Sequence, residues 1–357
     1  MAVQDVRKNT MIRVYSPTLD FMGTIENHTS LLWKRRYFEP GGFEVHAPAT
    51  DKNLRLLKPG NLIMRRGSVE AGIIGDLENE ESDIKNEVTR QGRFLSFYFD
   101  WRLIQGRVNF SGTVEDAMRQ LVSVNSEAVP LVELGERKGF AETVSFQATY
   151  KNLSSYLTKL AKSSGLGYRL RPDFRQKKLI FEVYKGVDRT LSQGINSRVI
   201  FSESYRNINN ALYKYNDQLY RTRAVVGGEG EGMNRVFVTV GGGKGLGLRE
   251  IFVDARDLSS EGLTTEQYKE KLRQRGLEKL AEHIINESME CEAEADINFR
   301  YLEHYDLGDI VSVDKRKWDI KMNQRLTELQ EVYQYGGMFV VPTLGDAIPE
   351  TIDWRDD

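Results

Sequence analysis

The sequence is poor in the residues that most often carry covalent crosslinks or metal chemistry. Its 357 residues include one cysteine, Cys291, which excludes an internal disulfide, and four histidines, which is few for a metalloenzyme. No Cys-His motif surrounds Cys291, so we interpret it as a small apolar residue. A single thiol is also typical of chains that fold in a reducing compartment. We therefore expect no metal site and no cofactor.

Long apolar runs and an excess of one charge are missing as well. No apolar run approaches the about 18 residues that a membrane-spanning helix needs, and the first ten residues lack the apolar core of a secretory signal. We expect residues 1–10 to form a flexible N-terminus and expect no membrane segment. The formal net charge is −2, whereas nucleic-acid-binding domains usually carry a basic face. No nucleic-acid specificity is therefore expected.

The patterns that are present predict an α+β fold with mainly β-structure. Short alternating apolar and polar runs, separated by turn residues, fill residues 11–110 and predict a first small β-barrel. Residues 111–195 combine helix patterns, each with a capping residue, and strand patterns, which indicates an α+β domain. Strand patterns return over residues 196–357 and predict a second β-barrel. This region also contains a long helix pattern at about residues 263–288, which can pack on the α+β domain.

One short pattern occurs twice, near the two ends of the chain. It reads GNLI at residues 60–63 and GDIV at residues 308–311. Each copy starts at a turn, continues through a hairpin and enters a strand that ends in an acid and a leucine, within residues 58–77 and 306–329. Chance similarity is an alternative explanation for so short a pattern. If the repeat is real, the two β-barrels are related.

The end of the second barrel gives the most detailed expectation. Turn residues there separate runs that alternate between apolar and polar side chains. In order, residues 299–344 predict a strand from Phe299, a turn at 307–309, a strand at 310–313, a loop at 315–323, a strand at 325–333, a turn at 335–337 and a strand at 338–341.

No catalytic motif is found in the sequence. The glycine-rich run at residues 241–247 lacks the first glycine of a Walker loop, because Val238 occupies that position, so we interpret the run as a hairpin tip. Acidic clusters occur at residues 78–83 and 290–296. A glycosidase needs two such acids held across a sugar, but these clusters are also typical of a solvated loop and of the polar face of a strand. We predict no catalytic, cofactor-binding or metal site.

Three segments of the chain carry structural motifs in a fixed order. The start, residues 11–77, has a strand pair followed by a Ser-x-x-Trp-x-Arg strand and a Gly-Phe-Glu segment, with Ser30, Trp33, Arg35, Gly42, Phe43 and Glu44 as the motif residues. The middle, residues 160–168, has a helix followed by a strand, and residues 306–311 with 325–328 form closing hairpins. In these three segments the chain resembles the hub proteins of siphophage tails and baseplates.

The resemblance implies a structural, non-enzymatic component of a virion. It implies a homotrimer whose two barrels per subunit form a pseudo-sixfold ring at the tail tip. Its partners would be the distal tail protein or tail tube, the C-terminus of the tape measure protein, and receptor-binding or fibre proteins. The protein would be made in the host cytoplasm and built into the virion.

Eight residues are candidates for barrel-core or interface positions under this interpretation. They are Trp33, Arg35, Phe43, Gly60, Gly308, Asp309, Ile310 and Val311. Two other functions stay open at this point. The chain could be a tail-associated cell-wall hydrolase, or a protein that binds carbohydrate on the host surface, since its aromatic residues could line a sugar groove as well as a core or subunit interface.

Overall fold

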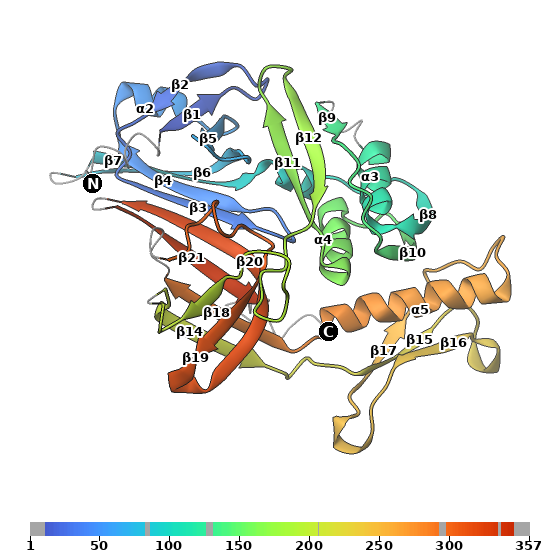
Figure 1. Cartoon of the computed structure of the whole chain (residues 1–357). Coiled ribbons are helices and arrows are strands. Elements are labelled where there is room, and N and C mark those ends of the chain that lie inside the picture. The colour runs from blue at the N-terminus through green and yellow to red at the C-terminus, as the bar shows by residue number, and fades with distance from the viewer. Residues whose placement is uncertain are drawn as a thin grey trace.

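Most strands of the chain belong to one 13-stranded sheet that connects the two ends of the sequence (Figure 1). The computed structural model describes residues 11–82, 86–125, 131–205, 207–292, 298–334 and 337–345. The flexible N-terminus predicted at residues 1–10 lies outside the described residues. Strands predominate and a few helices accompany them, so the predicted α+β fold with mainly β-structure is confirmed.

The N-terminal sheet unit comprises the first seven strands of the chain. They are hydrogen-bonded in the order β2-β1-β5-β6-β7-β4-β3. On β3 and β4 every second residue is buried, because successive side chains of a strand point to opposite faces. The elements are β1 (Ile12–Tyr15), β2 (Phe21–Ile25), β3 (Ser30–Arg36), β4 (Gly42–Pro48), α2 (Asp51–Leu56), β5 (Leu62–Arg65), β6 (Gly72–Glu81) and β7 (Asn86–Phe94).

An α+β region follows, with two helices and two small sheets. The capping residues found in the sequence begin both helices: Thr113 accepts the N–H of Asp116 at 3.2 Å, and Asn152 accepts the N–H of Ser155 at 2.9 Å. The sheets are β10-β8 and β11-β12-β9. The elements are η1 (Leu95–Trp101), β8 (Arg107–Thr113), α3 (Val114–Asn125), β9 (Val132–Leu134), β10 (Thr143–Thr149), α4 (Leu153–Ser164), β11 (Gly167–Asp173) and β12 (Lys178–Tyr184).

The C-terminal sheet unit contains the remaining strands of the large sheet. Within this unit the order is β13-β19-β20-β21-β18-β14. The elements are β13 (Ile200–Ser202), β14 (Asn209–Asn216), β18 (Asn286–Glu292), β19 (Ile310–Lys315), η5 (Arg316–Trp318), β20 (Ile320–Gln334) and β21 (Gly337–Gly345).

Two details predicted for this unit are wrong. The loop expected at residues 315–323 is a tight turn, because Lys315 at the end of β19 pairs directly with Ile320 at the start of β20. The strand expected from Phe299 is a turn, because Leu302 has a φ of 66° and donates its N–H to the carbonyl of Tyr305 at 2.9 Å. Residues 335–336 of the last predicted turn and residues 293–297, which hold most of the second acidic cluster, lie outside the described residues.

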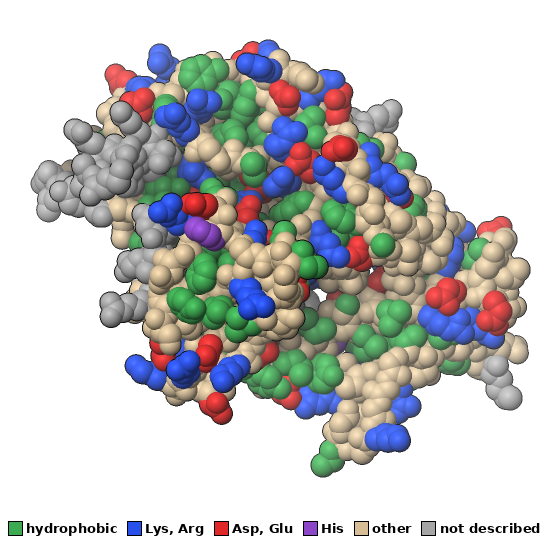
Figure 2. Space-filling view, viewed as in Figure 1, with side chains coloured by type: hydrophobic (Ala, Val, Ile, Leu, Met, Phe, Trp, Pro, Cys, Tyr) green, Lys and Arg blue, Asp and Glu red, His purple; other side chains and the backbone are tan. Residues whose placement is uncertain are grey.

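Between β14 and β18 the chain forms an arm that projects from the sheet (Figures 1 and 2). A three-stranded sheet, in the order β16-β15-β17, is covered on one face by α5 and has its own hydrophobic core. The described part of residues 196–357, predicted as one domain, therefore contains two cores. The elements are β15 (Arg223–Gly227), η3 (Gly232–Asn234), β16 (Phe237–Gly241), η4 (Gly245–Gly247), β17 (Glu250–Asp254) and α5 (Thr265–Glu282).

The long helix α5 is shorter than the pattern predicted. It ends at Glu282, and Asn286 already belongs to β18, so the end expected at residue 288 is wrong. Gly276 lies inside the helix because a Cβ there would come within 2.7 Å of methyl groups of Val240 and Val226 on the sheet below. The helix also contacts the α+β region, where Lys271 donates to Asn109 at 2.6 Å.

Candidate functional site: the junction between two repeated sheet units

The repeated pattern in the sequence is a repeated set of backbone hydrogen bonds. In both hairpins the N–H of the turn glycine donates to the backbone carbonyl of a residue on the returning strand. The N–H of that same residue donates to the carbonyl of the residue that follows the glycine. Both glycines have positive φ, 86° and 92°. The residues are Gly60, Asn61 and Ile74 in the first hairpin and Gly308, Asp309 and Leu326 in the second, with N···O distances of 2.8–2.9 Å.

The repeat extends over five strands of each unit. The order β5-β6-β7-β4-β3 in the N-terminal unit corresponds to β19-β20-β21-β18-β14 in the C-terminal unit, and the chain visits the strands in the same sequence. A bulge follows the equivalent residues Ile74 and Leu326 in both units. The shared strand order, turn and bulge support the prediction that the two units are related.

The strand registers align the two units residue by residue. Phe43 lies opposite Gly92, which lies opposite Ile74, while Met289 lies opposite Leu344, which lies opposite Leu326. One strand further along, Trp33 pairs with Phe43 and Tyr213 pairs with Met289. At this alignment several positions have the same residue in both units: Leu32 and Leu212, Lys34 and Lys214, Glu44 and Glu290, Leu77 and Leu329, and Val88 and Val340.

The two units meet where β3 pairs with the second half of β20. The antiparallel pairing runs from Arg36 opposite Glu328 to Ser30 opposite Gln334. On the outer face, Glu328 accepts ion pairs from both Lys34 and Arg36 at 2.8 Å. This junction makes the large sheet continuous between the two ends of the chain.

The inner face of the junction buries a network of charges. Arg35 on β3 is only 3% exposed. Its guanidinium donates to Glu70 at 3.1 Å, to the Tyr301 hydroxyl at 2.8 Å and to Asp306 at 2.6 Å. Glu70 belongs to the N-terminal unit, whereas Tyr301 and Asp306 precede β19 in the C-terminal unit. The arginine therefore bonds to both units at once.

Glu331 on β20 is the second centre of this network and is fully buried. Arg65 at the end of β5 lies 2.8 Å from one of its oxygens. The hydroxyls of Tyr301 and Tyr333 donate to the same carboxylate at 2.9 Å and 2.6 Å. Since Tyr301 also accepts from Arg35, the two charge clusters are joined through one hydroxyl.

The electrostatics of the junction keep Arg35 charged. Burial by itself lowers the pKa of Arg35, but Tyr301, Asp306 and Glu70 raise it, and the net pKa lies well above the usual value. Burial raises the pKa of Glu70, partly offset by the nearby Arg35. Buried ion pairs of this kind are costly to break, because the partner left behind is an uncompensated buried charge. The network therefore fixes the two units in one relative position.

Tyr37, just after β3, connects all three regions around the junction. Its ring is fully buried, and a Cβ on Gly308 or Gly167 would come within 2.6 Å of it. Its hydroxyl donates to the carbonyl of Gly165 at 3.1 Å and accepts the N–H of Gly186 at the same distance. Glycine is required at position 308 both for its positive φ and for this contact.

The structure distributes the eight candidate residues over different environments. Trp33 and Phe43 lie in the core of the N-terminal unit with ring centroids 5.9 Å apart, and Val311 lies in the core of the C-terminal unit. Gly60 and Gly308 occupy the two equivalent turns. Of the eight, Arg35 makes side-chain bonds to both units.

The two other candidates hold the segment that leads out of the α+β region. Asp309 accepts the N–H of Val187 and the guanidinium of Arg189, both at 2.7 Å. The N–H of Ile310 donates to the carbonyl of Val187 at 2.9 Å. These contacts hold residues 187–189 beside β19. Their interface role in an assembly stays a prediction.

Sequence analysis missed the buried network of charges around Arg35. Glu70, Arg65, Tyr301 and Glu331 are separated from it by tens to hundreds of residues, and no local motif connects them. One signal was present: Glu331 falls on the inward face of β20, between two buried residues of its alternation pattern. A charge at such a position indicates a buried partner.

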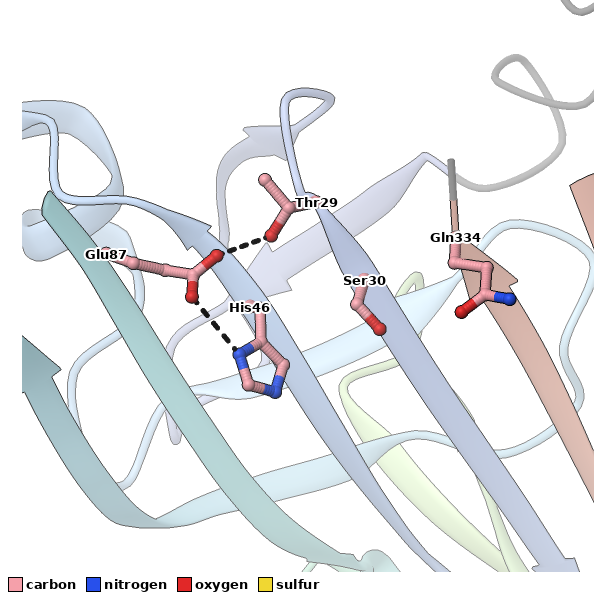
Figure 3. Close-up of a pocket in the computed structure, with 5 residues that line it drawn as sticks. All are labelled: Thr29, Ser30, His46, Glu87 and Gln334. Atoms are coloured by element: carbon pink, nitrogen blue, oxygen red, sulfur yellow. Dashed lines mark hydrogen bonds and ion pairs between the residues drawn. The ribbon is translucent and has the colours of Figure 1, made fainter. Parts of the chain in front are cut away.

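A shallow pocket of about 600 Å³ lies over the outer side of the junction. It is lined by Thr29, Ser30, His46, Glu87 and Gln334, from β3, β4, β7, β20 and the turn before β3 (Figure 3). Thr29 donates to Glu87 at 2.6 Å, and His46 lies 3.4 Å from the same carboxylate.

The pocket does not resemble a catalytic centre. The other ring nitrogen of His46 lies 2.7 Å from Glu44, so both nitrogens face carboxylates. Nucleophilic catalysis would require a hydrogen bond between Ser30 and His46, and the described structure has no such bond. No group of three or more His, Cys, Asp or Glu side chains in the described part of the chain could hold a metal ion. None of the described helices is long and apolar enough to cross a membrane.

This architecture is that of phage tail proteins. A tail protein from Neisseria meningitidis MC58 is similar over 95% of this chain and 97% of its own, with 14% identity and a TM-score of 0.60. The 43 kDa tail protein of prophage MuSo2 from Shewanella oneidensis (13% identity, 94% and 98% covered) and the prophage tail protein gp18 from Listeria monocytogenes EGD-e (13%, 95% and 94%) each have a TM-score of 0.56. At these identities the similarity shows the fold alone.

The family is shown by the sequence itself. Residues 11–346 match the family of Siphovirus ReqiPepy6 Gp37-like proteins, and the chain belongs to this family. No curated relative matches the chain. The resemblance to siphophage tail proteins is thereby confirmed, and the chain has the fold of phage tail proteins.

Proposed function

We propose that this protein forms the hub at the tail tip of a long-tailed phage, as a homotrimer with pseudo-sixfold symmetry. The observation that supports this most is the five-strand repeat within one chain. Three chains with two similar units each supply six similar sheet units. Such a ring can match a sixfold tail tube on one side and a threefold tip on the other.

The junction supports the proposal because it is a head-to-tail contact. β3 of one unit contacts the β6-equivalent strand, β20, of the other, so the two units present different surfaces to each other. Heterologous contacts of this kind generate closed rings when the rotation between units closes. The buried Arg35 and Glu331 network holds the units at one angle, which a ring of fixed size requires.

The partners follow from this position in the virion. The ring would bind the distal tail protein or the tail tube, together with the C-terminus of the tape measure protein. Receptor-binding or fibre proteins would attach on other faces. The protein would be made in the host cytoplasm and act without catalysis as part of the tail tip.

The proposal is tested by measuring the mass and shape of the assembled protein. Native mass spectrometry and negative-stain electron microscopy, with and without the distal tail protein of the same phage, should show three chains in a ring with six similar lobes. A chain that stays monomeric or dimeric at high concentration with its partner present contradicts the hub.

The two alternative functions have no specific observation in their favour within the described residues. A cell-wall hydrolase would clear host wall in a zymogram of the purified protein, and clearing would overturn the non-enzymatic role. A carbohydrate-binding protein would bind host wall polysaccharide saturably, with loss of binding when residues of the polar pocket, such as His46, are replaced.

A further inference from the structure

Among the described residues, two edges of the large sheet that lack a paired strand are related to each other by the internal repeat. Among the described residues, β14 pairs with β18 alone. Residues 76–81 of β6 pair with β7 on one side, and no strand of the described residues pairs with them on the other. An unpaired edge presents backbone N–H and carbonyl groups that can bond to another strand.

The repeat assigns a partner to each edge. β14 is the equivalent of β3, and residues 76–81 are the equivalents of residues 328–333 on β20. β3 pairs with this part of β20 within the chain. The equivalent pairing, of β14 with β6, is not made within the chain, because six strands separate them in the sheet order. A second copy of the chain can supply it.

Exposure of the apolar residues on these edges points to the same missing neighbour. Leu77 is 51% exposed, whereas its equivalent Leu329 is fully buried beside β3. Tyr215 is 54% exposed, whereas its equivalent Arg35 is 3% exposed. In each pair the buried residue has a paired strand on both sides, whereas the exposed residue has one on a single side among the described residues.

We infer that β14 of one copy adds antiparallel to residues 76–81 of β6 in the next copy. This rests on the proposed hub, and it specifies which strands join its subunits. The register of β3 on β20 places Tyr215 opposite Leu77 and Lys214 opposite Glu78 of the neighbouring copy. Directly opposed side chains on paired strands lie about 5 Å apart, within contact distance.

Charge on the two edges agrees with this pairing. The β6 edge carries Asp76 and Glu78, and β14 carries Lys214. Within the chain Lys34, the equivalent of Lys214, bonds to Glu328, the equivalent of Asp76. Within its own chain Lys214 lies 3.4 Å from Glu290 on the neighbouring strand β18. Two copies of the acidic β6 edge would repel each other, which favours the heterologous contact over a symmetric one.

A designed disulfide tests the register directly. The variant Tyr215→Cys/Leu77→Cys places two thiols opposite each other between copies, within the reach of a disulfide. The one native cysteine, Cys291, is buried. Oxidation should give covalent dimers and a closed covalent trimer on a denaturing gel, whereas each single variant should not. The matched control, Tyr215→Cys/Leu246→Cys, moves the second thiol to the exposed tip of the arm and should stay uncrosslinked.

The outcomes separate this inference from the hub itself. If the protein assembles but the paired cysteines crosslink no better than the control, the β14–β6 contact is wrong and the hub stands. If the protein stays monomeric at high concentration with the distal tail protein present, the β14–β6 contact and the hub are both overturned.

Charge exchange provides a second, independent measurement. Lys214→Glu should weaken assembly about tenfold, because it places like charges across the contact. Adding Asp76→Lys should restore most of the loss. Lys244→Glu, on the arm, should leave assembly unchanged. An equal effect of Lys244→Glu, or no rescue by Asp76→Lys, contradicts the contact.

Discussion

The N-terminal and C-terminal sheet units share a backbone and differ in what surrounds it. Five strands of each unit follow the same order, and both units have the same positive-φ glycine turn and the same bulge. In the N-terminal unit β3 and β4 are joined by a short turn, whereas in the C-terminal unit β14 and β18 are separated by the whole arm. The repeat therefore depends on turns and registers, and the insertions fall between strands, where they do not disturb the ladders.

Burial differs between equivalent positions for one physical reason. The second half of β20 has β3 beside it, and its inward residues are buried. Residues 76–81 of β6 have no such neighbour among the described residues, and all of them are exposed. Comparing the two units within one chain thus distinguishes positions that are exposed in both units from positions that are buried in one unit and exposed in the other.

The largest effect should come from removing the charge at the centre of the junction. Glu331→Ala leaves Arg65 buried without its partner and two tyrosine hydroxyls without their acceptor. We expect a loss of about 3–5 kcal/mol in unfolding free energy, measured by urea denaturation. The double variant Glu331→Leu/Arg65→Met should recover most of it, because no charge is then left unpaired. A single-variant loss below about 1 kcal/mol would show that the network does not hold the units together.

The next effect compares two equivalent leucines. Leu329→Ala should cost about 3 kcal/mol in the isolated chain, because it opens a cavity in a packed core. Leu77→Ala should cost less than about 0.5 kcal/mol there, since its side chain is half exposed. Thermal unfolding of both variants measures this difference. Similar losses for the two would contradict the difference assigned to their environments.

The two turn glycines give a third comparison. Gly308→Ala should cost about 2–3 kcal/mol, because a Cβ there would lie 2.2 Å from the ring of Tyr37 and the residue has a positive φ. Gly60→Ala meets nothing closer than Pro17 at 4.0 Å, so it should show the backbone cost alone, about 1 kcal/mol. Denaturant titration of both variants tests whether Tyr37 accounts for the difference.

The sequence predicted the turns of the repeat better than its strands. Gly60 and Gly308 stand out because a positive φ favours glycine, and the residues around them repeat. The equivalence of β3 and β14 was not visible, since SLLWKRR and NALYKYN share a leucine and a lysine and are aligned by pairing across the sheet. The charge network depends on contacts between distant residues, which a local pattern does not contain.

The error at the end of α5 has a similar cause. Ile284 and Ile285 continue the apolar spacing of the helix, so the pattern extended to residue 288. The helix stops at Glu282 because Asn286 pairs with Asn216 across the sheet. Tertiary pairing thus decided where the helix ends, and local spacing did not.

The smallest expected effect uses the one titratable difference between Trp33 and its equivalent, Tyr213. The hydroxyl of Tyr213 donates to Glu287 at 2.8 Å. Burial, followed by the bond to Glu287 and its charge, raises the pKa of Tyr213 to about 12 from an ordinary value of 10.0. A raised pKa means that this stabilising contribution is complete below pH 10 and is lost as the pH rises through about 12.

Tyr213→Phe should therefore lower the unfolding free energy by about 1 kcal/mol at pH 8, the usual value of one partly exposed hydrogen bond. The difference between variant and parent should shrink between pH 10 and about 12, because the parent loses the same proton. Other tyrosines titrate in both proteins and cancel in the comparison. Trp33→Phe, at the equivalent position of the N-terminal unit, should give a loss that does not depend on pH in this range. A pH-independent difference for Tyr213→Phe would show that the Glu287 bond does not stabilise the C-terminal unit.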